Sequence, residues 1–152
     1  MKHAWRFPEV MNAPFLLAVV VLVVNDHWLK GSGLLPGAVT GKTSDFAGLF
    51  FFPLLLVALA RLALSCTGRL PRLHPGALAL AVVATGAAFA AAKCTVAGAD
   101  AYRAALGLVW GSVRFTADPT DLTALAVLPA AFWYGRRLCP MRSLSAAAST
   151  AA

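Results

Sequence analysis

Residues 40–56 have the sequence TGKTSDFAGLFFFPLLL, in which a small polar group runs directly into a long apolar run. From residue 45 to residue 64, this run has the roughly 20 residues that a helix needs to cross a bilayer. The segment therefore predicts a transmembrane helix with Lys42, Ser44 and Asp45 at its start. Any site that these side chains help to form is expected at a membrane surface.

The composition of the whole chain indicates an integral membrane protein. Of 152 residues, 60% are hydrophobic and 12% are charged, whereas soluble domains have about 25% charged residues. A net charge of +7 would suggest nucleic acid as a partner of a soluble protein, but basic residues in so apolar a chain are expected beside membrane spans. Nucleic-acid binding is therefore not expected, and residues 1–142 are predicted to form one transmembrane domain.

Three more apolar segments predict membrane spans, at residues 11–29, 76–92 and 119–138. The first resembles a signal peptide in its basic start, but no cleavage site of small residues follows, so we expect it to be retained. The span 45–64 contains Pro53 in its middle and Arg61 near its end. The long side chain of Arg61 is expected to reach the lipid headgroups.

Two of the apolar segments have special patterns. In the span 76–92, Ala84, Ala88 and Ala92 recur every four residues, and small residues at this spacing let helices approach closely, which predicts a place at the bundle centre. Residues 101–115 are too short and too charged to span, but their larger apolar residues share one helical face.

The predicted fold class is all-α, an integral membrane four-helix bundle with a short interfacial amphipathic helix between the third and fourth spans. This interfacial helix covers residues 101–115. The tail at residues 143–152 is rich in alanine and serine and is predicted to be disordered.

Charged residues divide unevenly between the two sides of such a bundle. Four spans place both termini on one side, which carries eight cations and one acid, Glu9. These cations are Lys2, Arg6, Arg61, Arg69, Arg72, Arg136, Arg137 and Arg142. Because Lys and Arg are enriched in cytoplasmic loops, this side is predicted to be cytoplasmic. The outer side carries five cations and all five aspartates. The rule that orients the spans explains the cytoplasmic cations, but it does not require equal numbers of opposite charges on the outer side.

The outer side supplies the candidate binding residues. They are Asp26, His27, Lys30, Lys42, Ser44, Asp45, Lys93, Arg103, Arg114, Asp118 and Asp121. Asp26 falls at the carboxyl end of the first span, where the helix dipole disfavours an anion, so it requires a nearby cation. We predict that Asp26 and Lys93, or failing that Lys42, form the centre of the outward polar site.

Several of these residues also have a structural interpretation. The sequence DPTD at residues 118–121 is a typical helix start, with an aspartate as N-cap and a proline at the first position. Ser44 and Asp45 would likewise cap the second span if the helix began there. His27 has a side chain suited to carrying a proton, but no second histidine shares its face. Arg114 would hold a phosphate or neutralise a neighbouring aspartate.

The sequence predicts no metal site and no cofactor, and it leaves the catalytic residues, if any, unknown. Its cysteines, Cys66, Cys94 and Cys139, form no C-x-x-C pair and have no metal-ligand spacing. The sequence GKT at residues 41–43 lacks the upstream glycine that a nucleotide-binding P-loop requires. Two glycines at residues 107 and 111 form a G-x-x-x-G pattern in a segment too short to span, so the oligomeric state stays open.

Several short motifs resemble those of the VanZ-like family of small multi-pass bacterial membrane proteins. The motifs are Lys42-x-x-Asp45-Phe46 before an aromatic-rich span, then Arg114 and Asp121 before a span with Gly135. The family has Asp-Lys-x-x-His-Phe before its second span. Here Asp45 stands at the histidine position, and Lys93 lies near a position where the family has Glu or Gln. The resemblance covers residues 42–135.

This resemblance implies a protein of the bacterial inner membrane whose polar face looks outward, toward lipid-linked or peptidoglycan-related envelope molecules. The function predicted from the residues is binding of an envelope lipid headgroup or a membrane protein partner at the charged site. One alternative is an enzyme on an amphiphilic substrate, with Asp26 or Asp45 as general base and Arg114 and Lys93 holding an anion. Another is a small transporter or pore with a polar path of Asp26, His27 and Lys93, although no inverted repeat is present.

Overall fold

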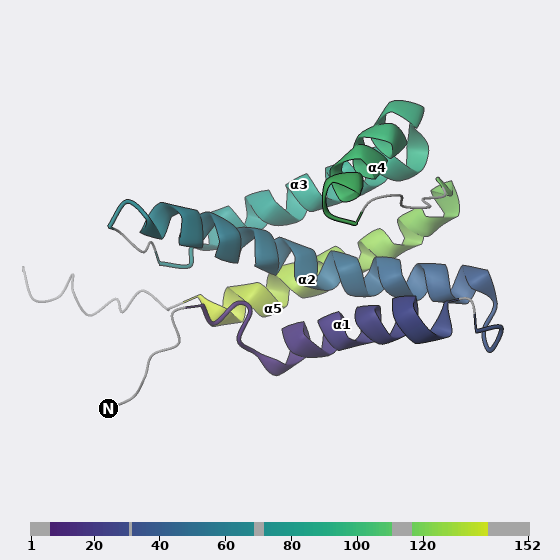
Figure 1. Cartoon of the computed structure of the whole chain (residues 1–152). Helices are drawn as coiled ribbons and strands as arrows, with labels where there is room; N and C mark the ends of the chain where they lie inside the picture. The colour runs from purple at the N-terminus through teal and green to yellow at the C-terminus, as the bar shows by residue number, and fades with distance from the viewer. Residues whose placement is uncertain (1–6, 31, 69–71, 111–116, 140–152) are drawn as a thin grey trace, which may run out of the picture.

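The computed structural model describes residues 7–30, 32–68, 72–110 and 117–139. All regular structure in these residues is helical, which confirms the predicted all-α class (Figure 1). Parts of the sequence prediction lie outside the described residues. These are Arg114, the last five residues of the predicted interfacial helix, the tail 143–152, and the cations Lys2, Arg6, Arg69 and Arg142.

Helix α1 spans Ala13–Val24 and continues into a π-helical turn, η1, at Asn25–Leu29. Asn12 caps α1, because its side chain accepts a hydrogen bond of 2.9 Å from the backbone N–H of Phe15, and Pro14 follows in the first turn. Almost the whole predicted span 11–29 is therefore helical. The wider turn at its carboxyl end is closed by the N–H of Lys30, which donates to the carbonyl of Asn25 at 2.7 Å.

Helix α2 spans Gly37–Ser65 and so begins eight residues before the predicted start at residue 45. No residue after Pro36 breaks the helix, and the hydroxyls of Thr40 and Thr43 donate back to carbonyls one turn earlier, at 3.1 and 2.9 Å. The predicted capping role of Ser44 and Asp45 is wrong, since both lie inside the helix. At 1.5 Å per residue, α2 is about 43 Å long, which exceeds the roughly 30 Å of a bilayer's hydrocarbon core.

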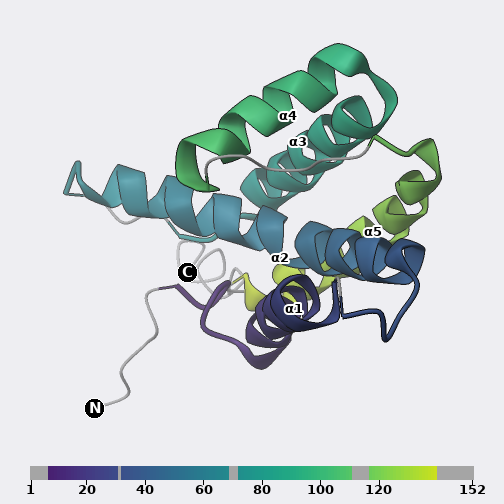
Figure 2. The ribbon, with the colours of Figure 1, turned by 45° about the vertical axis from the view of Figure 1, so that its right-hand side comes forward.

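Helix α3, Pro75–Cys94, joins helix α4, Val96–Trp110, through a corner at Thr95. Thr95 is extended, and its hydroxyl oxygen accepts from the N–H of Gly98 at 3.0 Å. A Cβ atom at Gly98 would lie 2.2 Å from the carbonyl oxygen of Ala91, so only glycine fits this corner. The corner sends α4 away from the axis of α3 and across one end of the bundle (Figure 2).

The predicted span 119–138 consists of two helical parts. Residues Pro119–Val127 form a 3-10 helix, η2, and Leu128–Leu138 form helix α5. Pro129 explains the change, because it has no N–H to donate to the carbonyl of Leu125 and its ring crowds the preceding turn. The N–H of Leu128 instead closes a 3-10 turn on Leu125.

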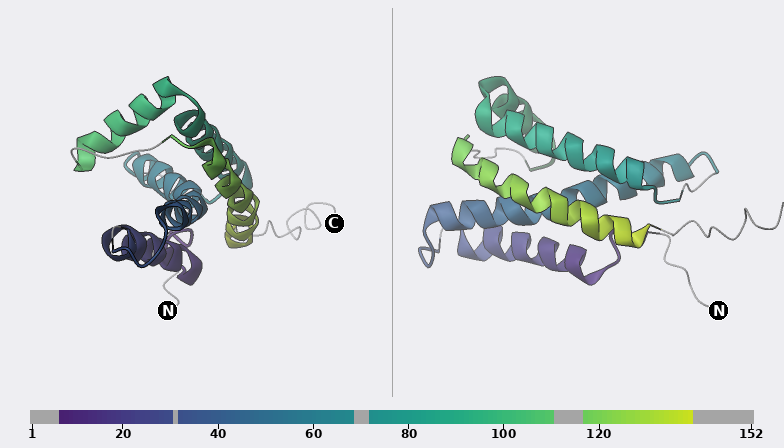
Figure 3. Two further views of the ribbon diagram at one scale, coloured as in Figure 1. Left: turned by 90° about the vertical axis from the view of Figure 1, so that its right-hand side faces the viewer. Right: turned by 180° about the vertical axis from the view of Figure 1, so that it is seen from behind.

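Helix α2 occupies the centre of the fold and contacts α1, α3, η2 and α5 (Figures 1 and 3). The core contains the fully buried Leu54 of α2 and Leu78 of α3. Gly135 of α5 packs against both leucines, where a Cβ atom would lie 2.5 Å from Leu78. The last helix therefore packs closely on α2 and α3 at Gly135.

The prediction that the alanine row of the third span forms a close helix contact is wrong for Ala84 and Ala88, which are exposed. The buried face of α3 carries Leu78, Ala81 and Thr85 instead. The row and the buried face differ because four-residue spacing drifts around a helix of 3.6 residues per turn. Of the row, only its last alanine, Ala92, is buried with this face.

Arg61 does not extend toward the lipid headgroups as predicted but is buried, with 8% of its surface exposed. Its guanidinium forms an ion pair with the fully buried Glu9 and stacks over Phe7 at 5.3 Å from the ring centroid. The turn before α1 positions Glu9, since the amide of Asn12 donates to the carbonyls of Pro8 and Glu9, each at 2.9 Å. This contact joins the start of the described chain to the end of α2.

Two of the described helices, α2 and α3, are long and apolar enough to cross a membrane. The segment Ala13–Leu29 is a shorter apolar helix. Helix α4 has 15 residues, or about 22 Å, which is less than the roughly 30 Å needed to span.

Candidate functional site

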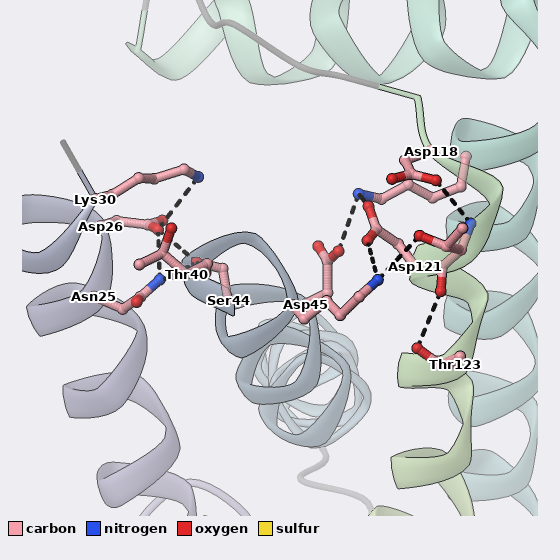
Figure 4. A network of polar contacts seen from close by, with 12 residues as sticks. Asn25, Asp26, Lys30, Thr40, Ser44, Asp45, Asp118, Asp121 and Thr123 are labelled. Atoms are coloured by element: carbon pink, nitrogen blue, oxygen red, sulfur yellow. Dashed lines mark hydrogen bonds and ion pairs between the residues drawn. The ribbon is translucent and has the colours of Figure 1, made fainter. Parts of the chain in front are cut away.

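The polar residues predicted on the outer side gather at one end of the bundle, here called the charged end. Asp26 follows α1, Asp45 lies in the early turns of α2, Lys93 lies in the last turn of α3, and Asp121 lies in the first turn of η2. Because these helices alternate in direction, all four positions fall at the same end, where Figure 4 shows Asp26, Asp45 and Asp121 and where Lys93 forms its ion pairs. At the opposite end Val10, Leu138 and Cys139 pack on one apolar core.

The Lys93 cluster, made of Lys42, Asp45, Lys93 and Asp121, joins three elements. Lys93 lies 3.0 Å from Asp45 and 2.6 Å from Asp121. Lys42 lies 3.1 Å from Asp121 and also donates to the hydroxyl of Thr120 at 3.1 Å. The cluster thus contains two ammonium groups and two carboxylates and ties α2, α3 and η2 together.

Lys93 is the buried centre of this cluster, with a side chain that is 6% exposed between carboxylates that are 18% and 14% exposed. A buried ammonium is stable only when it is paired, and two carboxylates provide the pairing. The prediction that Lys93 pairs with an aspartate is confirmed. Asp121 has a further stabilising interaction, because it stands in the first turn of η2, where the dipole favours an anion.

The Asp26 cluster, made of Asn25, Asp26, Lys30 and Ser44, lies on the other side of α2. The Ser44 hydroxyl donates to the Asp26 carboxylate at 2.6 Å, and Lys30 lies 3.5 Å from the same oxygen. The buried Asn25 amide donates to Ser44 and to the carbonyl of Thr40, each at 2.7 Å. Its own carbonyl oxygen, Oδ1, is buried and has no hydrogen-bond partner among the described residues.

The predicted pair of Asp26 with Lys93, or failing that with Lys42, is wrong, because both lysines pair with Asp121. Figure 4 shows α2 between the two clusters, with Asp26 beside Ser44 and Asp45 directed toward η2. Ser44 and Asp45 are consecutive in α2, so their side chains point about 100° apart and separate the two clusters. The dipole argument was correct that Asp26 needs a partner, and Lys30 and Ser44 provide it.

Tyr102 of α4 lies near both clusters. Partial burial raises the pKa of its hydroxyl, and the negative charges of Asp45 and Asp26 raise it further, while Lys93 lowers it. At the corner between α3 and α4, beside the start of η2, is a cavity of about 280 Å³. Its polar border includes Lys93, Thr95 and Arg103.

The remaining candidate residues have local roles. Asp118 caps η2 as predicted, because its carboxylate accepts from the N–H of Thr120 at 2.9 Å. Arg103 forms an ion pair with Asp100 one turn away on α4. His27 is exposed, and its Nδ1 lies 3.1 Å from the carbonyl oxygen of Val23. Neither His27 nor Asp118 enters either cluster, and Arg114 lies outside the described residues.

Sequence reasoning missed Asn25, Thr120 and Tyr102 at the charged end. Asn25 could have been found from the sequence, because a polar amide at the end of an apolar run costs free energy to bury unless it forms hydrogen bonds. The π-helical turn that carries it is a common feature of functional sites. Among the described residues, no group of three or more His, Cys, Asp or Glu side chains could hold a metal ion.

Comparisons with models of protein families, with curated proteins and with solved structures find no match to this chain. The resemblance to the VanZ-like family stays a prediction that rests on the short motifs around Lys42 and Asp121.

Proposed function

We propose that this chain is a four-span protein of the bacterial inner membrane that binds an envelope lipid headgroup at its charged end. Helices α2 and α3 support two of the spans by length and composition. At about 2.0 Å per residue for η2 and 1.5 Å for α5, the last two elements extend about 34 Å, enough for a third. The 17 residues of Ala13–Leu29 provide the fourth.

The orientation in this proposal follows from the cations at the opposite end. Arg136 and Arg137 lie in the last turn of α5 and stack over Phe132 and Trp133, with the guanidinium carbon 5.8 and 3.4 Å from the ring centroids. Arginine beside tryptophan is typical of the interface between membrane and water. The excess of basic residues makes this end cytoplasmic, so the charged end faces the envelope.

The observation that carries the binding function is the composition of the charged end. Two clusters of ions and hydrogen-bonding groups, drawn from separate helices, border an apolar bundle. Asp26 and Lys30 are 38% and 54% exposed, so they remain accessible to a headgroup, whereas Lys93 holds the underlying helices. A charged, partly exposed site at the level of the membrane surface fits a lipid headgroup better than a fully soluble ligand.

The test is the lipid content of the gently solubilised, purified protein, compared with the bulk membrane. We expect one lipid class to be enriched and the enrichment to be lost in the variant Asp26→Asn. The matched control is Asp100→Asn, because Asp100 forms an exposed pair on α4 outside both clusters. The proposal is wrong if the retained lipids match the bulk membrane, or if both variants behave alike.

A second candidate function is a membrane enzyme, and Ser44 is the observation that favours it. The Ser44 hydroxyl donates to Asp26 at 2.6 Å and accepts from Asn25, an arrangement that the sequence alone did not reveal. A carboxylate at this place would accept the proton if the hydroxyl attacked an electrophile. Labelling of Ser44 by a reactive fluorophosphonate, absent in Ser44→Ala, would favour this function over simple binding.

A further inference from the structure

Three exposed arginines lie at the end of the bundle opposite the charged end. Arg72 precedes α3, and Arg136 and Arg137 lie in the last turn of α5. The start of α3 and the end of α5 are at the same end of the bundle (Figures 1 and 3). Leu73 and Leu138, the chain neighbours of Arg72 and Arg137, pack in one apolar core. The three arginines therefore share one end of the molecule.

No acidic side chain of the protein pairs with these three arginines. The sequence contains six acidic side chains, and all six belong to the described residues. Glu9 lies at this end, but it is fully buried and forms its ion pair with Arg61. Of the five aspartates, four form ion pairs with other cations and Asp118 caps η2. The positive charge of the three arginines is therefore uncompensated, unlike that of the lysines at the charged end.

Helix dipoles account for only part of this charge. Arg136 and Arg137 stand at the carboxyl end of α5, where the dipole favours a cation. Arg72 stands two residues before His74, the N-cap of α3, where the dipole disfavours a cation. The first turn of α3 has no acidic residue to offset this charge. An anion from outside the chain would therefore stabilise this end.

An aromatic ring holds one of these arginines in a geometry that suits a phosphate. The guanidinium carbon of Arg137 lies 3.4 Å from the ring centroid of Trp133. A guanidinium stacked on a ring keeps its N–H groups in its own plane, where they can donate to phosphate oxygens. Trp133 is 57% exposed, and an exposed tryptophan near the end of a membrane span lies at the level of the headgroups. With α5 as a span, an anion at Arg137 lies at the bilayer surface.

We infer that this end of the protein binds anionic phospholipids of the leaflet that it faces, with phosphate groups at Arg72, Arg136 and Arg137. Each arginine contacts its own phosphate, so no single headgroup has to reach all three. An anionic lipid offsets the positive charge, whereas a zwitterionic lipid brings its own ammonium and does not. The inference shares with the proposed function only the crossing of the membrane by α3 and α5, and it does not use the site at Asp26.

The test measures which lipid contacts Trp133 when the full chain is placed in vesicles of phosphatidylglycerol and phosphatidylcholine with identical acyl chains. The chain has four tryptophans, so the other three, Trp5, Trp28 and Trp110, are replaced by phenylalanine. Brominated acyl chains quench tryptophan fluorescence on contact, and brominating one lipid at a time gives the lipid preference at Trp133. We expect phosphatidylglycerol to be preferred. Arg137→Gln should lower this preference about fivefold, the effect of one arginine near an anionic surface.

Two controls separate a local effect from the net charge of the protein. Arg103→Gln also removes one positive charge, from an exposed ion pair on α4, and should leave the lipid preference at Trp133 unchanged. A chain whose only tryptophan is Trp28 reports on lipid at the charged end, where Trp28 is 75% exposed. Quenching of Trp28 should not change with Arg137→Gln.

The possible outcomes separate this inference from the proposed function. Equal quenching of Trp133 by the two lipids, or a preference that survives the replacement of all three arginines by glutamine, refutes the inference and leaves the site at Asp26 standing. An equal loss of preference in Arg103→Gln and Arg137→Gln refutes it too. If neither lipid quenches Trp133, α5 does not face lipid, and the inference fails together with the four-span placement.

A different class of partner has its own outcome. Polyglutamate, added to the same protein in a neutral detergent, stands for an acidic protein segment. If polyglutamate shifts the emission of Trp133 in an Arg137-dependent way and phosphatidylglycerol is not preferred in vesicles, the partner is an acidic protein and the lipid inference is wrong.

Discussion

Replacing Lys93 by methionine tests the electrostatic design of the charged end. The substitution keeps most of the side-chain volume and removes the ammonium that lies 3.0 Å from Asp45 and 2.6 Å from Asp121. Asp45 then has no cation from the described ion pairs, because Lys42 is bonded to Asp121. Two carboxylates that are 18% and 14% exposed would face each other with one remaining lysine.

The expected loss of unfolding free energy is about 3–5 kcal/mol, the usual cost of removing one partner from a buried ion pair. This is a large share of the roughly 5–15 kcal/mol that stabilises a typical domain. The control is Lys30→Met, which removes an exposed pair at the same end of the bundle. Since an exposed ion pair contributes about 0–1 kcal/mol, this control should change stability little.

The assay is reversible unfolding of the purified protein in mixed detergent micelles, followed by helix content. The double variant Lys93→Met/Asp45→Asn removes both charges of one pair and should be more stable than Lys93→Met alone, with a coupling energy of about 0.5–3 kcal/mol. Asp26→Asn and Lys93→Met should add to within about 0.5 kcal/mol, because they belong to different clusters. A Lys93→Met variant no less stable than Lys30→Met would refute this reasoning.

Three other predictions concern packing, the opposite end and the orientation. Gly135→Ala should destabilise by about 1–3 kcal/mol in the same unfolding assay, because the added Cβ would lie 2.5 Å from a leucine side chain. Arg61→Met should cost more than Arg61→Met/Glu9→Gln, since the single change leaves a buried carboxylate unpaired. In intact cells, an impermeant maleimide should label a variant whose only cysteine is the exposed Cys94, and should label Cys66 only after lysis.

Each of these predictions has an outcome that would contradict it. Gly48→Ala is the matched packing control, since no atom lies within 4 Å of its added Cβ. If Gly135→Ala were as stable as Gly48→Ala, the close contact at Gly135 would be contradicted. If Arg61→Met/Glu9→Gln lowered the free energy of unfolding by the sum of the two single changes, Arg61 and Glu9 would not be energetically coupled. Labelling of Cys66 in intact cells, with Cys94 labelled only after lysis, would show that the protein has the opposite orientation in the membrane.

The sequence by itself determined the elements that depend on local chemistry. Long apolar runs predicted the helices, and the aspartate and proline at residues 118 and 119 correctly marked the start of η2, because capping requires only neighbours in the chain. The meeting of Asp26, Asp45 and Asp121 at one end of the bundle also followed from the sequence, since successive antiparallel helices fix which ends meet.

Only the tertiary structure decided which charges meet. Lys93 had several aspartates within possible reach, and the choice depended on the helical start of α2, which lies eight residues earlier than its apolar run suggests. That start turns Ser44 toward α1 and Asp45 toward η2, and so assigns Asp26 and Lys93 to separate clusters. Helical periodicity sets the angle between the side chains of Ser44 and Asp45. The packing of α2 against its neighbouring helices determines which residues these side chains contact.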